Sequence, residues 1–371
     1  MMKQLSLIVI FFSFFTVQYS LACYNEYFTL DAKGKTHHVH PGGLRFDTNF
    51  DLKKIEKELR ELGRKLNEKP DFEILSDYAL RLVKTGKTKE ALVIFEALVK
   101  KYPNEYTLHA NLGTTYELSG NNQLALEHIQ KSILINPKSH KGSEWIHVKL
   151  LEAKIALEKN PDYLKNHSIL NLSSKQKASE KTITFLIIQL KERFPFCKGP
   201  KDPIMAGLFE DLGDCYMEQI SYEYAKAFYQ IAVNYYGDKS KRLNDKIEEA
   251  RSLREQHKEL EPSLDESMKF EGPKEYMSII KVGGVPYKEF LYSHQDHTIN
   301  WDGISLDSKA LLALVGIEDK VDKPSAEIKK ESPKKTTIKP DKQPASQIGL
   351  YLMLGFFGAG IILFVIYKRI K

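Results

Sequence analysis

The chain is poor in cysteine and tryptophan, with 3 and 2 of them among its 371 residues, and its formal net charge of +6 is modest. A charge of this size gives no case for nucleic acid as a partner. The HExxH signature of zinc proteases is absent, as is an LPxTG-like signal for cell-wall sorting. These absences leave membrane attachment, protein binding and less familiar enzymatic functions to be weighed.

The first residues have the pattern of a secretory signal peptide. Met1–Lys3 is short and basic, Leu5–Val17 is apolar, and Ser20–Ala22 places small residues where signal peptidase cleaves. We therefore predict a signal peptide over residues 1–22. An N-terminal transmembrane anchor is the alternative, although the apolar run is shorter than the ~20 residues that a span needs.

The three cysteines leave two questions open. Cys23 follows the predicted cleavage site directly, as in a lipoprotein, but Ser20 stands where lipoprotein signals usually have leucine. Lipidation of Cys23 and an unmodified Cys23 are both retained. Cys197 and Cys215 would face an oxidising compartment, so we predict either a disulfide between them or two buried thiols.

The C-terminal end predicts a single membrane span. Ile348–Tyr367 is twenty residues without a charge, which at about 1.5 Å per residue crosses the ~30 Å hydrocarbon core. Lys368, Arg369 and Lys371 follow at once and fit the positive-inside rule. We expect residues 368–371 to form a basic cytoplasmic tail, with the bulk of the chain outside the cytoplasm.

This topology describes a single-pass membrane protein with an extracytoplasmic ectodomain. The periplasmic side of a bacterial inner membrane is the favoured location, and a eukaryotic type I protein is the alternative. Residues 318–346 are rich in lysine, proline, serine and threonine. Such a segment cannot bury enough apolar surface to offset its ordering entropy, so we predict a disordered tether between body and span.

Two consecutive stretches, 72–105 and 106–139, repeat one pattern with a period of 34 residues. Positions one period apart are matched in size and type: Ala79 and Gly113, Leu82 and Tyr116, Gly86 and Gly120, Ala91 and Ala125, and Pro103 and Pro137. A third copy at 206–238 has Gly213, Tyr216 and Ala225 at the expected positions. We therefore predict a repeat protein made of helical hairpins.

The pattern resembles the tetratricopeptide repeat (TPR). That family has small residues at the eighth and twentieth positions because the two helices of a repeat cross closely there. A glycine near the fifteenth position ends the first helix in a left-handed cap, and a closing proline stops the second. The usual tryptophan near the fourth position is absent from both clear copies. The resemblance implies an all-α fold, a helical-hairpin solenoid over residues 51–260.

Other helical segments complete this predicted solenoid. Leu52–Leu66 has the pattern of a leading helix, and Glu144–Glu158 and Ser179–Phe194 are interpreted as parts of degenerate hairpins over 140–200. Arg242–Leu260 is a charged amphipathic helix of the kind that caps a solenoid.

Two flanking segments depart from the helical pattern. Residues 23–50 are predicted to be an N-terminal loop segment, with a short strand at Tyr27–Leu30. Residues 261–317 are predicted to be a small membrane-proximal α+β segment, either an appendage or an arm packed back on the last repeats. Its helix would begin at Ser308, with Ser305 or Asp307 as the cap.

The resemblance implies a scaffold that binds other proteins and catalyses nothing. In TPR proteins the first helix of each repeat lines a concave groove for a peptide or partner helix. The residues that the register places there are Ser76, Leu80, Val83, Lys84, Ala110, Asn111, Thr114 and Glu117. Trp145 is a second candidate contact, since tryptophan is enriched in binding hot spots. We expect a protein partner and a membrane, but no cofactor, metal or small-molecule substrate.

Histidine-bearing segments support the alternative, a metal-handling or enzymatic envelope protein whose solenoid only carries them. The segments are His37, His38 and His40; His140, Glu144 and His147 on one helix face; and His294, Asp296, His297 and Asp302 in one loop. None has the ligand spacing of a recognised zinc site. A polar loop, and a surface hydrogen-bonding patch beside Trp145, are the simpler interpretations.

Overall fold

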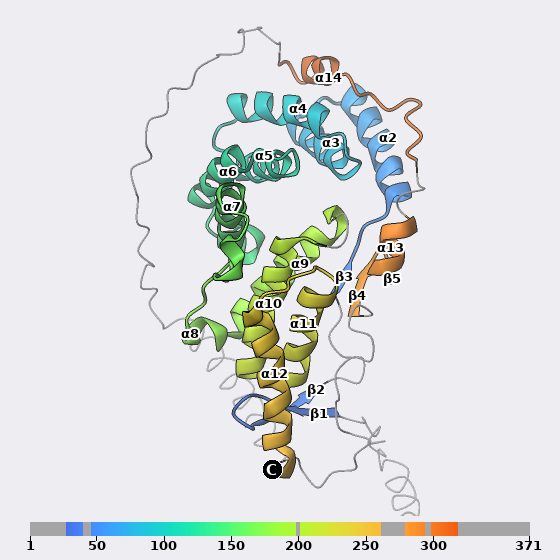
Figure 1. Ribbon diagram of the computed structural model, residues 1–371. Helices are drawn as coiled ribbons and strands as arrows, with labels where there is room; N and C mark the ends of the chain where they lie inside the picture. The colour runs from blue at the N-terminus through green and yellow to red at the C-terminus, as the bar shows by residue number, and fades with distance from the viewer. Residues whose placement is uncertain (1–26, 40–45, 198–200, 261–278, 294–297, 318–371) are drawn as a thin grey trace, which may run out of the picture. The chain divides into compact units, whose positions relative to one another are not determined.

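The computed structural model describes five stretches of the chain: residues 27–39, 46–197, 201–260, 279–293 and 298–317. All of them belong to one unit. They are mostly helical (Figure 1), which confirms the prediction of a mainly α-helical protein. Several predictions lie outside the described residues, namely those for 1–22, Cys23, 318–346, 348–367 and 368–371.

The described helices follow one another with short connections. No helix in these five stretches is both long and apolar enough to cross a bilayer. The α-helices are α2 (Leu52–Glu68), α3 (Phe72–Lys84), α4 (Thr88–Lys101), α5 (Tyr106–Leu118), α6 (Asn122–Ile135), α7 (Glu144–Lys159), α8 (Ser174–Lys177), α9 (Glu180–Arg193), α10 (Pro203–Gln219), α11 (Tyr222–Asn234), α12 (Lys241–Gln256), α13 (Tyr287–Ser293) and α14 (Ser308–Leu314). Short 3₁₀ turns are η1 (Ser139–Gly142), η2 (Tyr163–Lys165), η3 (Phe194–Phe196) and η4 (Lys258–Leu260).

Glycine ends the first helix of each of the two regular hairpins, α3–α4 and α5–α6. Gly86 and Gly120 adopt φ values of +81° and +85°, the left-handed conformation that the sequence pattern predicts. The backbone N–H of Lys87 then donates to the carbonyl of Leu82, which closes the cap after α3. In each of these two hairpins, one glycine in the left-handed conformation therefore lets the chain reverse direction between the two helices.

Small residues allow the paired helices to cross closely. A methyl group on Gly113 of α5 would lie 2.8 Å from side-chain carbons of Ile129 in α6. On Gly213 of α10 it would lie 2.3 Å from the ring of Tyr229 in α11. The predicted physical reason for small residues at these positions is therefore confirmed.

Consecutive helices pack on one another from α2 to α7, and again from α9 to α12. Helix α7 packs along α6 and makes smaller contacts with α9 and α10. It is therefore the helix through which the first group of helices meets the second. Between α7 and α9 the chain forms only η2 and the single turn α8.

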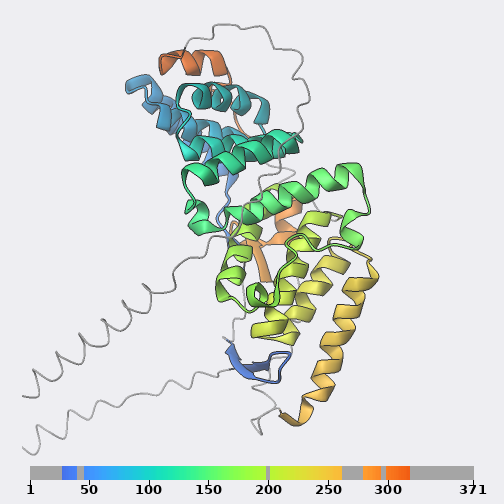
Figure 2. The same cartoon turned by 90° about the vertical axis from the view of Figure 1, so that its left-hand side faces the viewer.

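The N-terminal strands β1 (Tyr27–Leu30) and β2 (Thr36–Val39) form an antiparallel hairpin, of which β1 was predicted. The hydroxyls of Thr29 and Ser221 are 2.7 Å apart, and the N–H of Ala32 donates to the carbonyl of Met217. These bonds hold the hairpin at the junction of α10 and α11 (Figure 2).

A second small sheet joins the two flanking segments. Strand β3 (Phe46–Thr48) pairs in parallel with β4 (Ile280–Val282), which pairs with β5 (Val285–Pro286). The fully buried Phe46 ring lies 5.8 to 6.2 Å from three phenylalanine rings of the helical core, Phe194, Phe209 and Phe228. The sheet is therefore built into the core.

The segment after β5 packs on two parts of the fold. The ring of Tyr287 in α13 lies 5.3 Å from that of Phe194 and 5.9 Å from that of Tyr235, whereas residues 298–317 pack on the first helices. Arg60 of α2 donates to the carbonyl of Asn300 at 2.7 Å, and Tyr78 of α3 donates to that of Ser305 at 2.7 Å. Helix α14, capped by Asp307, lies beside α4 in both views (Figures 1 and 2). Sequence alone cannot show contacts between residues this far apart in the chain.

Candidate functional site

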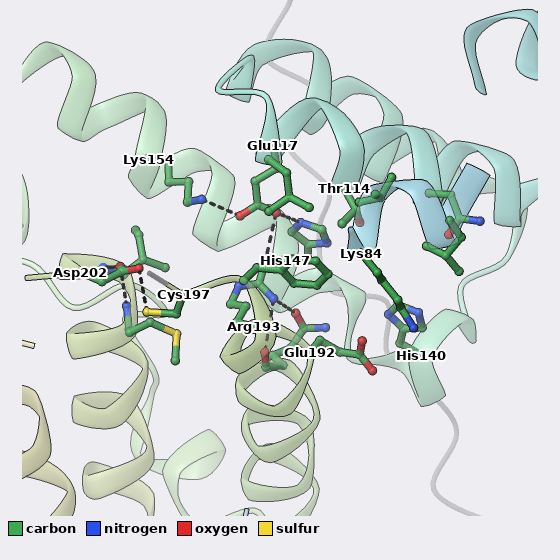
Figure 3. A pocket seen from close by; sticks show the side chains of 18 residues that line it. Lys84, Thr114, Glu117, His140, His147, Lys154, Glu192, Arg193, Cys197 and Asp202 are labelled. Atoms are coloured by element: carbon green, nitrogen blue, oxygen red, sulfur yellow. Dashed lines mark hydrogen bonds and ion pairs between the residues drawn. The ribbon is translucent and has the colours of Figure 1, made fainter. Parts of the chain in front are cut away.

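A cavity of about 240 Å³ opens between α3, α5, α7 and α9, next to the start of α10 (Figure 3). Most of the residues predicted to face a partner line it, and these are Leu80, Val83, Lys84, Asn111, Thr114 and Glu117. Ser76 and Ala110 are buried and do not line it. Trp145 lies elsewhere, half-buried against the hydrophobic core.

Helical spacing explains why these side chains converge. Leu80, Val83 and Lys84 are three and four residues apart on α3, so they share one face. Asn111, Thr114 and Glu117 do the same on α5. Because α3 and α5 are the first helices of adjacent hairpins, their corresponding faces border the same cavity.

A buried ion-pair network forms one wall of the cavity, and we call it the Glu117 cluster: Glu117, Glu144, His147, Lys154 and Arg193. One ring nitrogen of His147 (Nε2) lies 2.6 Å from Glu117 Oε2, and the other (Nδ1) lies 3.0 Å from Glu144 Oε1. Lys154 Nζ is 2.7 Å from Glu117 Oε1 (Figure 3). The network ties α5, α7 and α9 together.

Both ring nitrogens of His147 face carboxylate oxygens, which is the geometry of an imidazolium that donates two hydrogen bonds. Burial lowers the pKa of His147, but Glu117 and Glu144 outweigh it, so the pKa is raised above 6.5. Burial also raises the pKa of Glu117, but Arg193 and His147 bring it well below its usual 4.5. We infer a charged cluster at neutral pH.

The predicted grouping of His140, Glu144 and His147 is present, since His140 Nδ1 lies 2.8 Å from Glu144 Oε2. The expectation of a surface patch is wrong, because Glu144 and His147 are only 2% and 4% exposed. The polar face of α7 points inward, toward Glu117 of α5 and Arg193 of α9. Trp145 is therefore not the centre of an exposed polar patch.

Lys84 is the exception among the cations that line the cavity. Within the described residues its ammonium group has no hydrogen bond or ion pair, whereas Lys154 and Arg193 each have a partner. Burial and the charge of Arg81 lower the pKa of Lys84, and the carboxylates of Glu192, Glu58 and Asp77 only partly oppose them. Figure 3 draws no hydrogen bond or ion pair to Lys84.

A second cavity of about 840 Å³ adjoins the first. Its lining combines the apolar side chains of Phe50, Phe196, Phe290, Ile299 and Trp301 with two lysines and three threonines. We call it the aromatic cavity. Sequence analysis missed it because its walls come from parts of the chain that are far apart in sequence, from Phe50 to Trp301.

The structure has Cys197 and Cys215 as two buried thiols rather than a disulfide. Cys197 Sγ lies 3.7 Å from Asp202 Oδ2, the residue that caps α10. Cys215 lies inside α10, where burial raises its pKa to about 12. The structure therefore agrees with the prediction of two buried thiols and not with that of a disulfide.

The other histidine segments can be placed only in part. His37 Nε2 lies 2.8 Å from Asp31 Oδ2 on the β1–β2 hairpin. Among the described residues no group of three or more histidine, cysteine or acidic side chains is placed to hold a metal ion. The side chains of His38, His40, His294, Asp296 and His297 lie outside the described part, and Asp302 lies on the loop bonded by Arg60.

The chain was also compared with known proteins. No protein-family model matches it, and no curated protein does. The function of the cavity therefore has to be argued from its own residues.

Proposed function

We propose that this protein is a non-enzymatic, membrane-anchored TPR scaffold that binds a peptide or helix of a protein partner in the cavity between α3, α5, α7 and α9. The sequence register predicted which residues would face a partner. The observation that carries the proposal is that six of them, three from α3 and three from α5, border one cavity.

The composition of the cavity also favours recognition over chemistry. Its polar groups are drawn from several helices, and those of the Glu117 cluster already bond one another. A charged wall fixed in this way holds the shape of a groove, since Glu117, Glu144 and His147 are each restrained by two or more neighbours. Beside it, Leu80, Val83 and Leu118 supply apolar surface for a bound segment.

The location of the proposed activity follows from the predicted signal peptide, tether and span. They would place the cavity on the outer face of a membrane, where the partner would be an extracytoplasmic protein. Such a scaffold would concentrate or position its partner at that surface.

In-cell photocrosslinking tests the proposal directly. A photoreactive residue replaces Thr114 in the cavity, and the matched control replaces Lys131, which is exposed on α6. We expect a discrete protein adduct from position 114 and none from position 131. Equal capture at both positions, or none at either, would contradict groove binding.

A further inference from the structure

The cavity between α3, α5, α7 and α9, which we call the charged cavity, and the aromatic cavity form one continuous surface. They share part of their lining, namely Val83, Lys84, Leu118, Phe196 and Cys197. Leu118, at the last turn of α5, is 36% exposed and so presents apolar surface where the two cavities meet. A bound segment at this junction would touch both cavities.

One cation at the charged end of this surface has no bonded anion among the described residues. Lys84 borders both cavities and has no hydrogen bond or ion pair among the described residues. Of the other cations nearby, Lys154 contacts Glu117, and Arg193 donates to Gln189 Oε1 at 2.9 Å while its Nε and Nη2 have no acceptor among the described residues. Glu192 lines the same cavity but does not bond Lys84. A carboxylate placed at Lys84 would therefore gain an ion pair that the protein itself does not supply.

The aromatic cavity has side chains against which an aromatic ring of a partner can pack. Phe50 and Phe196 meet edge to face at 6.3 Å, and Phe50 and Phe290 at 5.8 Å. Trp301 is half-buried at the wall, with Lys87 Nζ 5.0 Å from its ring centroid. A further aromatic side chain would pack against these rings in the same geometry that they adopt with one another.

We infer that the partner segment carries an acidic side chain next to a large aromatic one, with the carboxylate paired to Lys84 and the ring in the aromatic cavity. This inference rests on the proposed function and names the chemistry of the partner. It requires no chain terminus, because an internal aspartate or glutamate supplies the carboxylate.

The two tryptophans of the chain allow a direct test, because Trp301 lines the aromatic cavity and Trp145 lines neither cavity. The full chain, labelled with 5-fluorotryptophan in non-ionic detergent, gives two ¹⁹F resonances, and Trp301→Phe assigns them. The probes are acetylated and amidated serine-rich peptides with one glutamate and one phenylalanine, separated by zero to three residues. Matched peptides carry glutamine for glutamate or alanine for phenylalanine.

We expect at least one glutamate–phenylalanine peptide to shift the Trp301 resonance and leave that of Trp145 unchanged. Either matched peptide should bind about tenfold more weakly or worse. Lys84→Gln should abolish the preference for glutamate over glutamine while keeping that for phenylalanine over alanine. The control, Lys89→Gln on the exposed side of α4, should keep both preferences.

The inference is overturned if no peptide shifts Trp301, or if Lys84→Gln weakens glutamate and glutamine peptides equally. Either result leaves the proposed function standing as long as position 114 captures a partner. Absence of capture at position 114 refutes the proposed function itself, whatever the peptides do.

Discussion

Two buried charged clusters of this protein differ in how completely the fold pairs them. In the second, which we call the Glu210 cluster (Lys177, Glu210, Asp214, Arg242 and Lys246), every carboxylate oxygen has a partner. Lys246 lies 2.7 Å from Glu210 and 2.6 Å from Asp214. The remaining oxygens meet Arg242 at 2.8 Å and Lys177 at 2.7 Å.

The Glu117 cluster is less complete, and it borders the charged cavity. Arg193 has two buried nitrogens without a hydrogen-bond acceptor among the described residues, against one for Arg242 in the Glu210 cluster, and its Nη2 is 3.7 Å from Glu117. Lys84, beside the cluster, lacks an anion. Neither Glu210 nor Asp214 lines the charged or the aromatic cavity. The comparison suggests that the Glu210 cluster serves the fold and that the surroundings of the Glu117 cluster serve a partner.

Lys246→Ala is the strongest test of this division. The change leaves the buried carboxylates of Glu210 and Asp214 without their shared cation, so we expect the free energy of unfolding to fall by about 3 kcal/mol. Urea denaturation followed by circular dichroism measures it. Lys241→Ala on the same helix is the control, because Lys241 is 87% exposed and pairs only with Asp245; we expect a change below about 0.5 kcal/mol. A similar loss in both variants would contradict the structural role.

Replacing the glycine at each of two helix crossings with alanine should destabilise the protein to different degrees in the two regions. In Gly213→Ala the new carbon meets the rigid ring of Tyr229, whose hydroxyl donates to Asp214, and we expect a loss of about 2–3 kcal/mol. In Gly113→Ala it meets Cδ1 and Cγ1 of Ile129 at 2.8 Å and the Ala125 carbonyl oxygen at 3.1 Å, which are less severe overlaps. The helix-propensity gain of about 1 kcal/mol offsets part of the cost in both variants. Thermal unfolding of both variants should rank Gly213→Ala as clearly worse, and the reverse order would be inconsistent with this packing.

The local part of the fold follows from sequence because its causes are local. The 34-residue period locates α3 to α6, and Gly86 and Gly120 mark where the chain must turn left-handed. The same period fixes which side of α3 faces inward, so Lys84 could be placed before the structure was known. These features depend only on residues a few positions apart.

Features that depend on distant residues could not be predicted. Phe46 pairs with Ile280, and no local pattern in either strand identifies the other. Glu117 was expected to meet a partner, yet its side chain is only 8% exposed and faces His147 and Lys154. That role depends on how α7 packs on α5, which its own hydrophobic stripe does not show.

The pH dependence of stability should carry the signature of His147. Its pKa is raised in the folded state, so the stabilisation is complete below the unfolded pKa of about 6.5 and is lost as pH rises through the folded value. The loss is about 1.4 kcal/mol for each unit by which the fold raises the pKa. Glu117, Glu144 and Arg193 face His147, and His140, whose pKa is also raised by Glu144, shares that carboxylate with it.

The variant His147→Gln isolates this contribution. Its stability deficit relative to the wild type should be largest near pH 6 and should shrink toward pH 9, as shown by urea denaturation at each pH. Buried Asp211, whose pKa is raised by burial and by Asp214, adds the same slope to both proteins, so the difference is the quantity to compare. A deficit that does not change with pH would mean that His147 is not charged in the fold.

The smallest effect has the opposite sign. Lys84→Met replaces a half-buried, unpaired ammonium with an apolar side chain of similar length, so we expect the free energy of unfolding to rise by about 0.5–1 kcal/mol, limited by solvent screening. Lys89→Met, at an exposed position, should change it by less than about 0.5 kcal/mol. Urea denaturation measures the stability of both variants. The photocrosslinking yield at position 114, measured in the same variants, shows how much partner each one captures. If the Lys84 variant is more stable but captures less partner, this lysine serves binding and lowers the stability of the fold. If the variant is less stable, Lys84 belongs with Lys246 among the residues that stabilise the fold.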